Sequence, residues 1–112
     1  MQEPTFVILT VLADGEQHGY GIMRAVEGTS RGAVTLRPGT LYAALDRLTL
    51  EGLVRVSREE HSPGGQLRRY YDLTPAGGDA LRIEAEKRRQ LALLALRRLR
   101  NGPATGATAH PA

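Results

Sequence analysis

Cysteine and tryptophan are both absent from this 112-residue chain, and aromatic residues make up only 4% of it. Without cysteine the chain forms no disulfide, holds no thiolate zinc site and has no cysteine nucleophile. No apolar run approaches the roughly 18 residues that a membrane-spanning helix needs, and no leader-like segment opens the sequence. We therefore expect no membrane partner, no signal peptide and a cytoplasmic location.

Catalytic and metal-binding patterns are equally scarce. The three histidines, His18, His61 and His110, fall in separate segments, and none has a metal-ligand spacing or an adjacent nucleophile motif. The sequence thus predicts no catalytic residue, no metal site and no cofactor. We expect that the protein is not an enzyme.

The length and charge of the chain limit the number of domains and the kinds of partner that we expect. A chain of this length with 41% apolar residues supports one domain with a modest core. Its net charge is +3, and residues 1–30 hold one arginine against four acidic residues, so the basic character begins after them. Fourteen of the fifteen basic residues are arginine, which suits contacts to phosphate and guanine but equally fits codon usage in a GC-rich genome.

The most informative segment predicts a helix over residues 38–52. Pro38 fits the first helical position, and Leu41, Leu45 and Leu48 recur at the spacing of a buried stripe. At 100° per residue, the opposite face has Tyr42 on its shoulder and carries Thr40, Ala43, Asp46, Arg47 and Leu50. Short side chains on that face would let the helix approach the floor of a DNA groove. Asp46 could accept a hydrogen bond from a cytosine amine or pair with a neighbouring arginine.

A β-hairpin is predicted to follow this helix. The segments LVRVSR (53–58) and LRRYYDL (67–73) alternate as strands around EEHSPGGQ, which has a Pro-Gly-Gly tip. Because side chains alternate between the faces, one of Tyr70 and Tyr71 must face the core.

Three further helices are expected. Thr5 can cap a first helix with the body FVILTVLA, although by period alone this run would equally suit a buried strand. A second helix should run from about His18 to Glu27, stop at Gly28 and bury Ile22, Met23 and Val26. Thr74 should cap a last helix that has Pro75 at its first position.

Three motifs in this order resemble the PadR-like transcriptional regulators: HGYGI at 18–22, PGTLYAAL followed by LEGLV at 38–54, and LRRYYDLTPAG at 67–77. The resemblance spans roughly residues 3–81. It implies a mainly α fold with a small β-hairpin wing (α+β), namely a winged helix-turn-helix plus a C-terminal dimerisation helix. We assign residues 1–74 to the DNA-binding domain, 75–100 to the dimerisation helix and 101–112 to a disordered tail.

The resemblance also implies a function. The chain should be a sequence-specific, DNA-binding transcriptional regulator, a homodimeric repressor that reads a palindromic operator in double-stranded DNA with the helix at 38–52 and the wing at 53–73. Gly19 and Gly21 would then lack side chains so that the DNA backbone can come close to the helix. The candidate DNA contacts are His18, Tyr20, Arg37, Pro38, Gly39, Thr40, Tyr42, Arg47, Arg58, Arg68 and Arg69, with the Pro38 and Gly39 amides offered to a phosphate.

Some of these candidate DNA contacts have an alternative explanation. Tyr20 could equally be a packing residue, and His18 a local helix cap. Arg37 stands where many relatives have a capping serine, so it either meets a phosphate or faces solvent. Glu59, Glu60 and His61 lie near the wing tip, where paired carboxylates would be repelled by phosphates. The tip could therefore stay off the DNA.

The end of the last helix predicts assembly. Five leucines between Leu91 and Leu99 point almost all round the axis, and a second copy can cover them. A monomer that wraps this helix with its own first helix is the alternative. The predicted dimer interface consists of Leu91, Leu94, Ala95, Leu96 and Leu99.

Two functional questions stay open at this level. The resemblance implies a small apolar or aromatic effector near the dimer interface, whose identity the sequence does not give. The chain could also be a winged-helix protein-interaction module without specific DNA binding, since fold alone does not fix function.

Overall fold

The computed structural model describes residues 1–102, which form four α-helices and a small antiparallel sheet. The fold is mainly α with a β-hairpin, as the sequence predicts. The proposed disordered tail lies, from residue 103 onward, outside the described residues. No helix among residues 1–102 is long and apolar enough to cross a membrane.

Helix α1 (Glu3–Leu12) lies in the middle of the core. Its buried residues point in several directions around the axis and include Val7, Ile8, Leu9, Val11 and Leu12. Burial on several sides removes the periodic pattern, so the sequence alone could not distinguish this helix from a strand. The predicted cap was wrong: Gln2 is the N-cap residue, and Thr5 is a buried residue inside the helix.

Helix α2 (Gly19–Thr29) packs against α1 and buries Ile22 and Val26, whereas Met23 is only half-buried at the edge of the core. His18 is its N-cap: the ring Nδ1 accepts a hydrogen bond from the Gly21 N–H at 3.1 Å. The helix continues to Thr29, so the predicted stop at Gly28 was too early.

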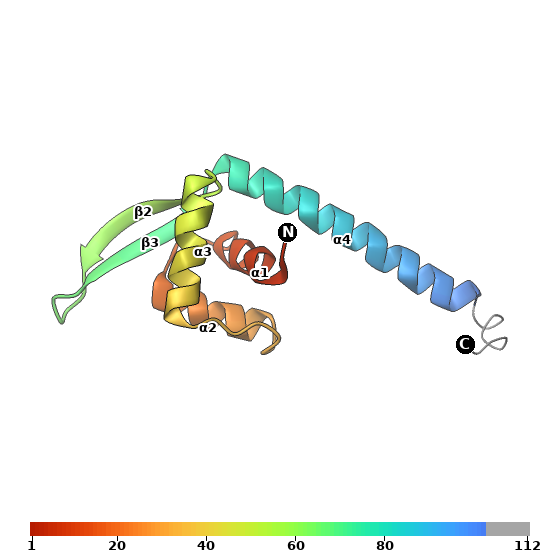
Figure 1. Cartoon of the computed structure of the whole chain (residues 1–112), viewed down its shortest axis with the longest axis horizontal. Helices are drawn as coiled ribbons and strands as arrows, with labels where there is room; N and C mark the ends of the chain where they lie inside the picture. Colours follow the sequence, from red (N-terminus) through yellow and green to blue (C-terminus); the bar gives the residue numbers. More distant parts are fainter. Residues whose placement is uncertain (103–112) are drawn as a thin grey trace. The chain divides into compact units, whose positions relative to one another are not determined.

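Helix α3 (Pro38–Leu50) buries Leu41, Leu45 and Leu48 completely, which confirms the predicted stripe. It ends two residues before the predicted boundary at 52. Gly52 has φ +78°, the Gly52 N–H donates to the Thr49 carbonyl, and the Leu53 N–H donates to the Leu48 carbonyl. This is a Schellman ending, which the left-handed glycine makes possible. Figure 1 shows α3 beside the two long strands.

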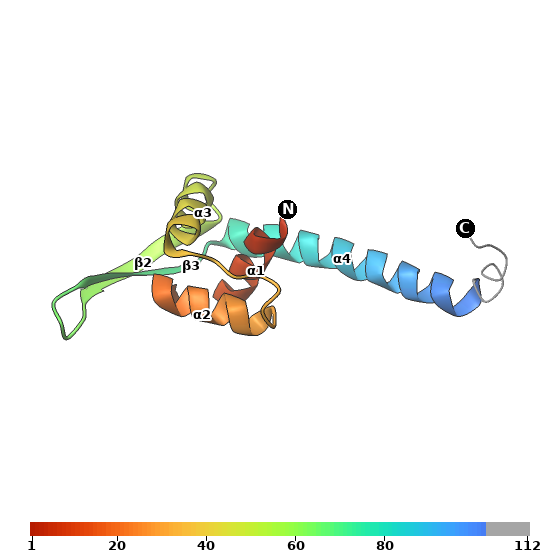
Figure 2. The same ribbon diagram turned by 60° about the horizontal axis from the view of Figure 1, so that its bottom comes forward.

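The sheet has three strands in the order β1-β3-β2. The predicted hairpin is β2 (Val54–His61) and β3 (Leu67–Leu73), and β2 extends three residues further than expected. Strand β1 (Gln17–His18) was not predicted, because two residues carry no alternation pattern. In Figures 1 and 2 the hairpin extends beyond α1, α2 and α3.

Helix α4 (Pro75–Asn101) begins at the predicted cap. The Thr74 hydroxyl accepts a hydrogen bond from the Gly77 N–H at 3.0 Å and donates to the Gly52 carbonyl at 2.6 Å. The chain divides into two compact units, one from Met1 to Leu81 and one from Arg82 onward, so α4 passes from the first into the second.

Candidate nucleic-acid interface

A shallow groove of about 350 Å³ lies between α3 and the wing. It brings together all three sequence motifs, and its lining residues are His18, Gly19, Tyr20, Tyr42, Gln66, Leu67, Arg68 and Arg69. A second hollow next to it shares Tyr42, Leu67 and Arg69 and adds Asp46 and Tyr71. Five of the predicted DNA contacts therefore line one continuous surface, which we call the α3–wing groove.

Tyr42 forms the wall of this groove that faces α2. A Cβ atom on Gly19 would collide with the Tyr42 hydroxyl, and one on Gly21 would collide with the side-chain oxygen of Gln17. A methyl group at either glycine would therefore have to displace the end of a neighbouring side chain. Close approach of the DNA backbone to these two glycines stays a prediction.

The structure favours different explanations for the predicted contacts His18 and Tyr20. The His18 side chain caps α2, and its ring meets the edge of Tyr70 at a centroid distance of 5.4 Å, so the local-cap alternative describes its place in the fold. Tyr20 is 61% exposed, with the Arg24 guanidinium 5.8 Å from its ring centroid. Its ring is not packed in the core and stays available to a partner.

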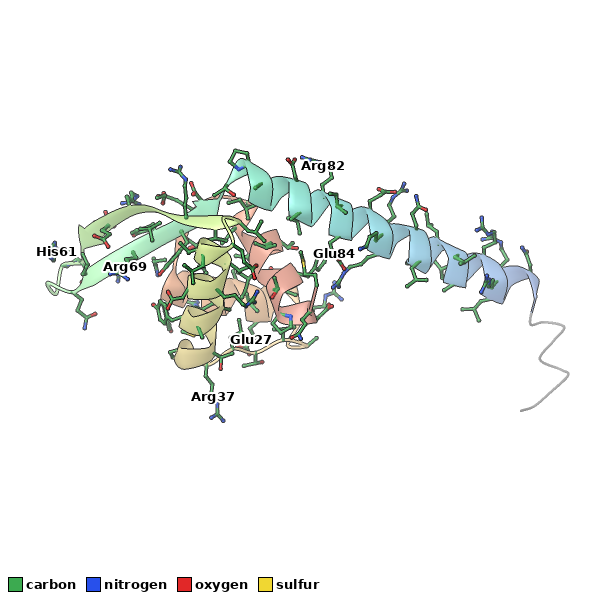
Figure 3. The ribbon with its side chains drawn as sticks, turned by 45° about the horizontal axis from the view of Figure 1, so that its top comes forward. Glu27, Arg37, His61, Arg69, Arg82 and Glu84 are labelled. Carbon is green, nitrogen blue, oxygen red and sulfur yellow. The ribbon has the colours of Figure 1, made fainter. Side chains whose placement is uncertain are left out.

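The beginning of α3 is open to solvent. Residues 37–40 are all exposed, and the Arg37 side chain makes no capping hydrogen bond. Figure 3 shows Arg37 pointing away from the end of α3. Pro38 has no N–H, so the expectation that it donates to a phosphate was wrong. The amides without an intrahelical acceptor at this end are those of Gly39 and Thr40.

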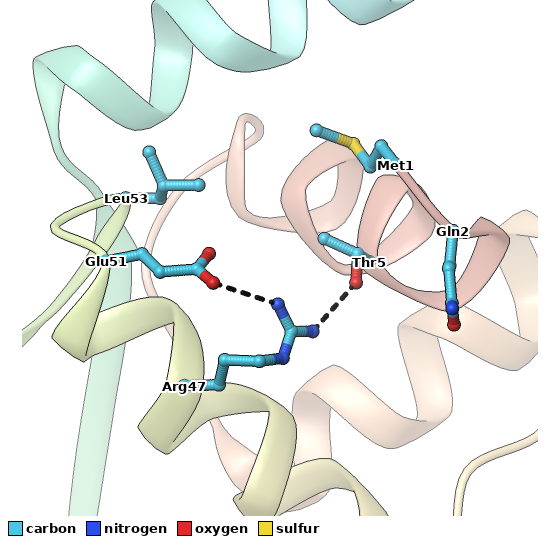
Figure 4. Close-up of a pocket in the computed structure, with 6 residues that line it drawn as sticks. All are labelled: Met1, Gln2, Thr5, Arg47, Glu51 and Leu53. Atoms are coloured by element: carbon cyan, nitrogen blue, oxygen red, sulfur yellow. Dashed lines mark hydrogen bonds and ion pairs between the residues drawn. The ribbon is translucent and has the colours of Figure 1, made fainter.

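Arg47 lies apart from the α3–wing groove. Its Nη2 donates to the Thr5 Oγ1 at 3.0 Å, and its Nη1 is 3.6 Å from the Glu51 Oε2 (Figure 4). The side chain thus reaches toward α1, where it lines a separate pocket with Met1, Gln2, Thr5, Glu51 and Leu53. The helical wheel placed Arg47 on the exposed face, but the hydroxyl of Thr5 directs its guanidinium to one edge of that face.

Arg58 is held between two carboxylates. Its Nε donates to Glu16 at 2.7 Å, its Nη1 donates to Glu60 at 2.6 Å, and the guanidinium lies 3.8 Å from the centroid of the Tyr70 ring. The two carboxylates raise the pKa of Arg58. Hydrogen bonds from Arg58 and Ser57 lower the pKa of Glu16, and those from Tyr70 and Arg58 lower that of Glu60. Arg58 thus keeps its charge, which is paired with two carboxylates of the same chain.

The other two wing arginines differ from one another. The Arg69 Nε donates to Glu59 at 2.8 Å, which raises the pKa of Arg69. Arg68 is exposed and donates no hydrogen bond to a carboxylate within residues 1–102. Arg68 lies opposite Glu60 in the hairpin, and of the three predicted wing contacts it is the one that no carboxylate of residues 1–102 holds by a hydrogen bond.

Several residues of this surface were missed by sequence reasoning. Glu16 bridges to the wing through Arg58 and through Ser57, whose hydroxyl donates to Glu16 at 2.7 Å. Ser57 occupies a β-bulge between Val56 and Arg58. The two segments are about forty residues apart, and no local pattern marks such a contact.

The predicted dimer-interface residues lie in the second unit, on α4. Leu91, Leu96 and Leu99 are 69%, 59% and 68% exposed in the single chain, Ala95 is exposed and Leu94 is half-buried. Apolar side chains on α4 therefore remain uncovered within this unit.

Comparison with known proteins supplies the family. A model of the transcriptional regulator PadR-like family matches residues 8–83. The transcriptional regulator Rv3488 of Mycobacterium tuberculosis is 43% identical over 88 residues, which cover 79% of this chain and 75% of the relative. The chain spans only 23% and 28% of the length of two further curated relatives, from Streptomyces fradiae and Escherichia coli.

Solved structures agree on the fold. A PadR family transcription regulator of Clostridium difficile superposes with a TM-score of 0.70 at 29% identity, covering 85% of this chain and 96% of that one. Bacillus subtilis PadR, solved in complex with operator DNA, superposes with a TM-score of 0.67 at 24% identity, covering 73% and 46%. The matched family and its relative from Mycobacterium tuberculosis are transcriptional regulators and not enzymes, as expected from the sequence. This chain belongs to the PadR-like family of transcriptional regulators.

Proposed function

We propose that this protein is a homodimeric transcriptional repressor that binds a palindromic operator through the α3–wing groove. The observation that carries the proposal is the convergence of Tyr20, Tyr42 and Arg68 on one exposed groove beside the open end of α3. Bacillus subtilis PadR, which shares this fold, was solved with operator DNA. A chromosomal operator would place the protein in the cytoplasm.

The chemistry of α3 supports insertion into a major groove. The exposed positions Gly39, Thr40 and Ala43 carry small side chains, so the helix can come close to base edges. The amides of Gly39 and Thr40 can donate to a phosphate at the helix N-terminus. Arg68 supplies a charge-assisted contact from the wing, and phosphate contacts of this kind set the register of the protein on the duplex.

Dimerisation through α4 would account for a palindromic operator. The exposed leucines of α4 are too many for a stable solvated helix face, and a second copy related by a two-fold axis buries the same residues from both chains. Two α3 helices related by that axis would read half-sites about 34–36 Å apart. A small apolar effector at this interface would release DNA only if it binds one spacing of the two α3 helices better than another.

The experiment that tests the function is selection of bound sequences from a random duplex pool, at low and at physiological salt. An inverted repeat with half-sites about one helical turn apart is expected. Weak retention that disappears at physiological salt would instead favour the alternative, a winged-helix protein-interaction module. Transcription from a promoter carrying the selected repeat, with and without the protein, then distinguishes repression from activation.

A further inference from the structure

Asp46 is an exposed carboxylate on the face of α3 that borders the α3–wing groove. It lies one helical turn after Tyr42, and both side chains line the same hollow with Leu67, Arg69 and Tyr71. Within residues 1–102 its carboxylate accepts no hydrogen bond and forms no ion pair. Asp46 is therefore a bare negative charge beside the surface that we propose binds DNA.

The arginines that could neutralise Asp46 are engaged elsewhere. Arg47, its neighbour in sequence, reaches to Thr5 and Glu51 on the α1 side. Arg69, which lines the same hollow, donates to Glu59 across the hairpin. The structure thus removes the simpler of the two explanations for this residue, a local salt bridge.

An unpaired carboxylate on such a face weakens binding to DNA of any sequence, because the phosphates repel it. That loss is recovered only where a base edge offers a hydrogen-bond donor. In the major groove, cytosine offers its N4 amine, whereas guanine N7 and O6 and thymine O4 are acceptors that repel a carboxylate. Adenine offers an N6 amine, but its N7 acceptor lies beside it.

We propose that Asp46 is the base-reading residue of α3 and that it accepts a hydrogen bond from the N4 amine of a cytosine in each half-site. This proposal rests on the DNA-binding function proposed above. The residues one turn before Asp46 on the same face are Ala43 and Tyr42, and those at the helix start are small. Only Tyr42 is bulky there, and its hydroxyl packs against Gly19, so Asp46 is free to reach a base.

The variant Asp46→Asn gives the sharpest test. An asparagine carboxamide has the same shape but no charge, and it pairs bidentately with adenine N6 and N7. Sequence selection with the wild-type protein should give cytosine at one position of each half-site, and selection with Asp46→Asn should shift that position toward adenine. Replacing the C·G pair with T·A should weaken wild-type binding by about tenfold to a hundredfold, and Asp46→Asn binding by far less.

Glu27→Gln is the matched control. Glu27 is exposed on α2, lines neither hollow of the α3–wing groove, and its loss changes the net charge by the same amount. It should strengthen binding generally while keeping the wild-type base preference. Asp46→Ala serves as a second variant of the same residue. Thermal melts of the wild type and of the three variants check that each protein folds.

Two results overturn the inference, and they are distinguishable. If the wild type enriches a repeat and both Asp46 variants enrich the same bases at every position, Asp46 reads nothing and only this inference fails. If the wild type enriches no sequence at all, the proposed DNA-binding function fails with it. A change of preference at one position per half-site, absent in Glu27→Gln, establishes the role.

Discussion

At the scale of single residues, most charged side chains of the wing form ion pairs within the protein. Glu16 and Glu60 hold Arg58, and Glu59 holds Arg69, so two arginines that would otherwise attract DNA are paired with three carboxylates that would repel it. The predicted repulsion at the wing tip is thereby reduced. What remains for phosphate is Arg68.

This pairing predicts different effects for two wing arginines. Arg68→Ala should lower operator affinity and reduce the slope of log affinity against log salt by about one for each protomer, because one phosphate contact is lost. Arg58→Ala should change that slope much less, since its charge is already balanced by Glu16 and Glu60. Fluorescence anisotropy titrations on the selected operator at several salt concentrations measure both slopes; equal slopes for the two variants would contradict the assignment.

A second residue-scale prediction concerns Gly19. In Gly19→Ala the new methyl group displaces the Tyr42 hydroxyl, which is the far end of a mobile side chain. Folding should therefore change little, within about 1 kcal/mol, because alanine also favours the helix. Operator affinity should fall, because Tyr42 leaves its place in the α3–wing groove.

Gly28→Ala is the control for this variant, because Gly28 lies on the same helix and an added Cβ meets open space. It should keep wild-type operator affinity. Thermal melts and anisotropy titrations measure the two quantities separately, and an equal loss of affinity in both variants would remove Tyr42 from the interface.

At the scale of elements, the start of α4 is fixed to the start of β2 by backbone contacts. The Thr74 N–H donates to the Leu53 carbonyl at 3.1 Å, and Gly77 packs directly against the same carbonyl oxygen. A backbone oxygen held by a hydrogen bond cannot move aside as a side chain can. Gly77 is therefore required by close packing.

The adjacent glycines of α4 give a matched pair. Gly77→Ala should destabilise the fold by about 1–3 kcal/mol through overpacking against Leu53. Gly78→Ala meets open space and should stabilise the helix by up to about 1 kcal/mol. Chemical denaturation followed by circular dichroism measures both, and a destabilised Gly78→Ala would show that α4 does not tolerate alanine here for another reason.

At the scale of the whole molecule, the proposed assembly depends on apolar side chains that the single chain leaves uncovered. Leu99→Glu should shift the protein from dimer to monomer in sedimentation velocity, because it places a charge in the proposed apolar interface. Operator binding should weaken as well, because each monomer then binds its half-site independently. Leu50→Glu changes a leucine on α3 that is even more exposed than Leu99, and it should leave the dimer intact. A dimer that survives Leu99→Glu would contradict the assigned interface.

The sequence by itself determined the features that depend on neighbouring residues. Leu41, Leu45 and Leu48 form the buried stripe of α3, Thr74 caps α4, and one tyrosine of the Tyr70–Tyr71 pair, Tyr71, is buried. Helical spacing, capping chemistry and strand alternation are local rules, so a linear pattern reveals them. The fold class followed from these patterns together with the resemblance of three motifs.

Only the tertiary structure decided which distant side chains meet. Arg47 was placed on the exposed face by its helical angle, but Thr5, 42 residues away, draws its guanidinium toward α1. Arg58 was a wing contact by sequence, and Glu16, also 42 residues away, neutralises it. Long side chains choose partners by proximity in the folded chain, which residue spacing does not encode. For the same reason Asp46 could be recognised as an unpaired charge only after the places of both arginines were known.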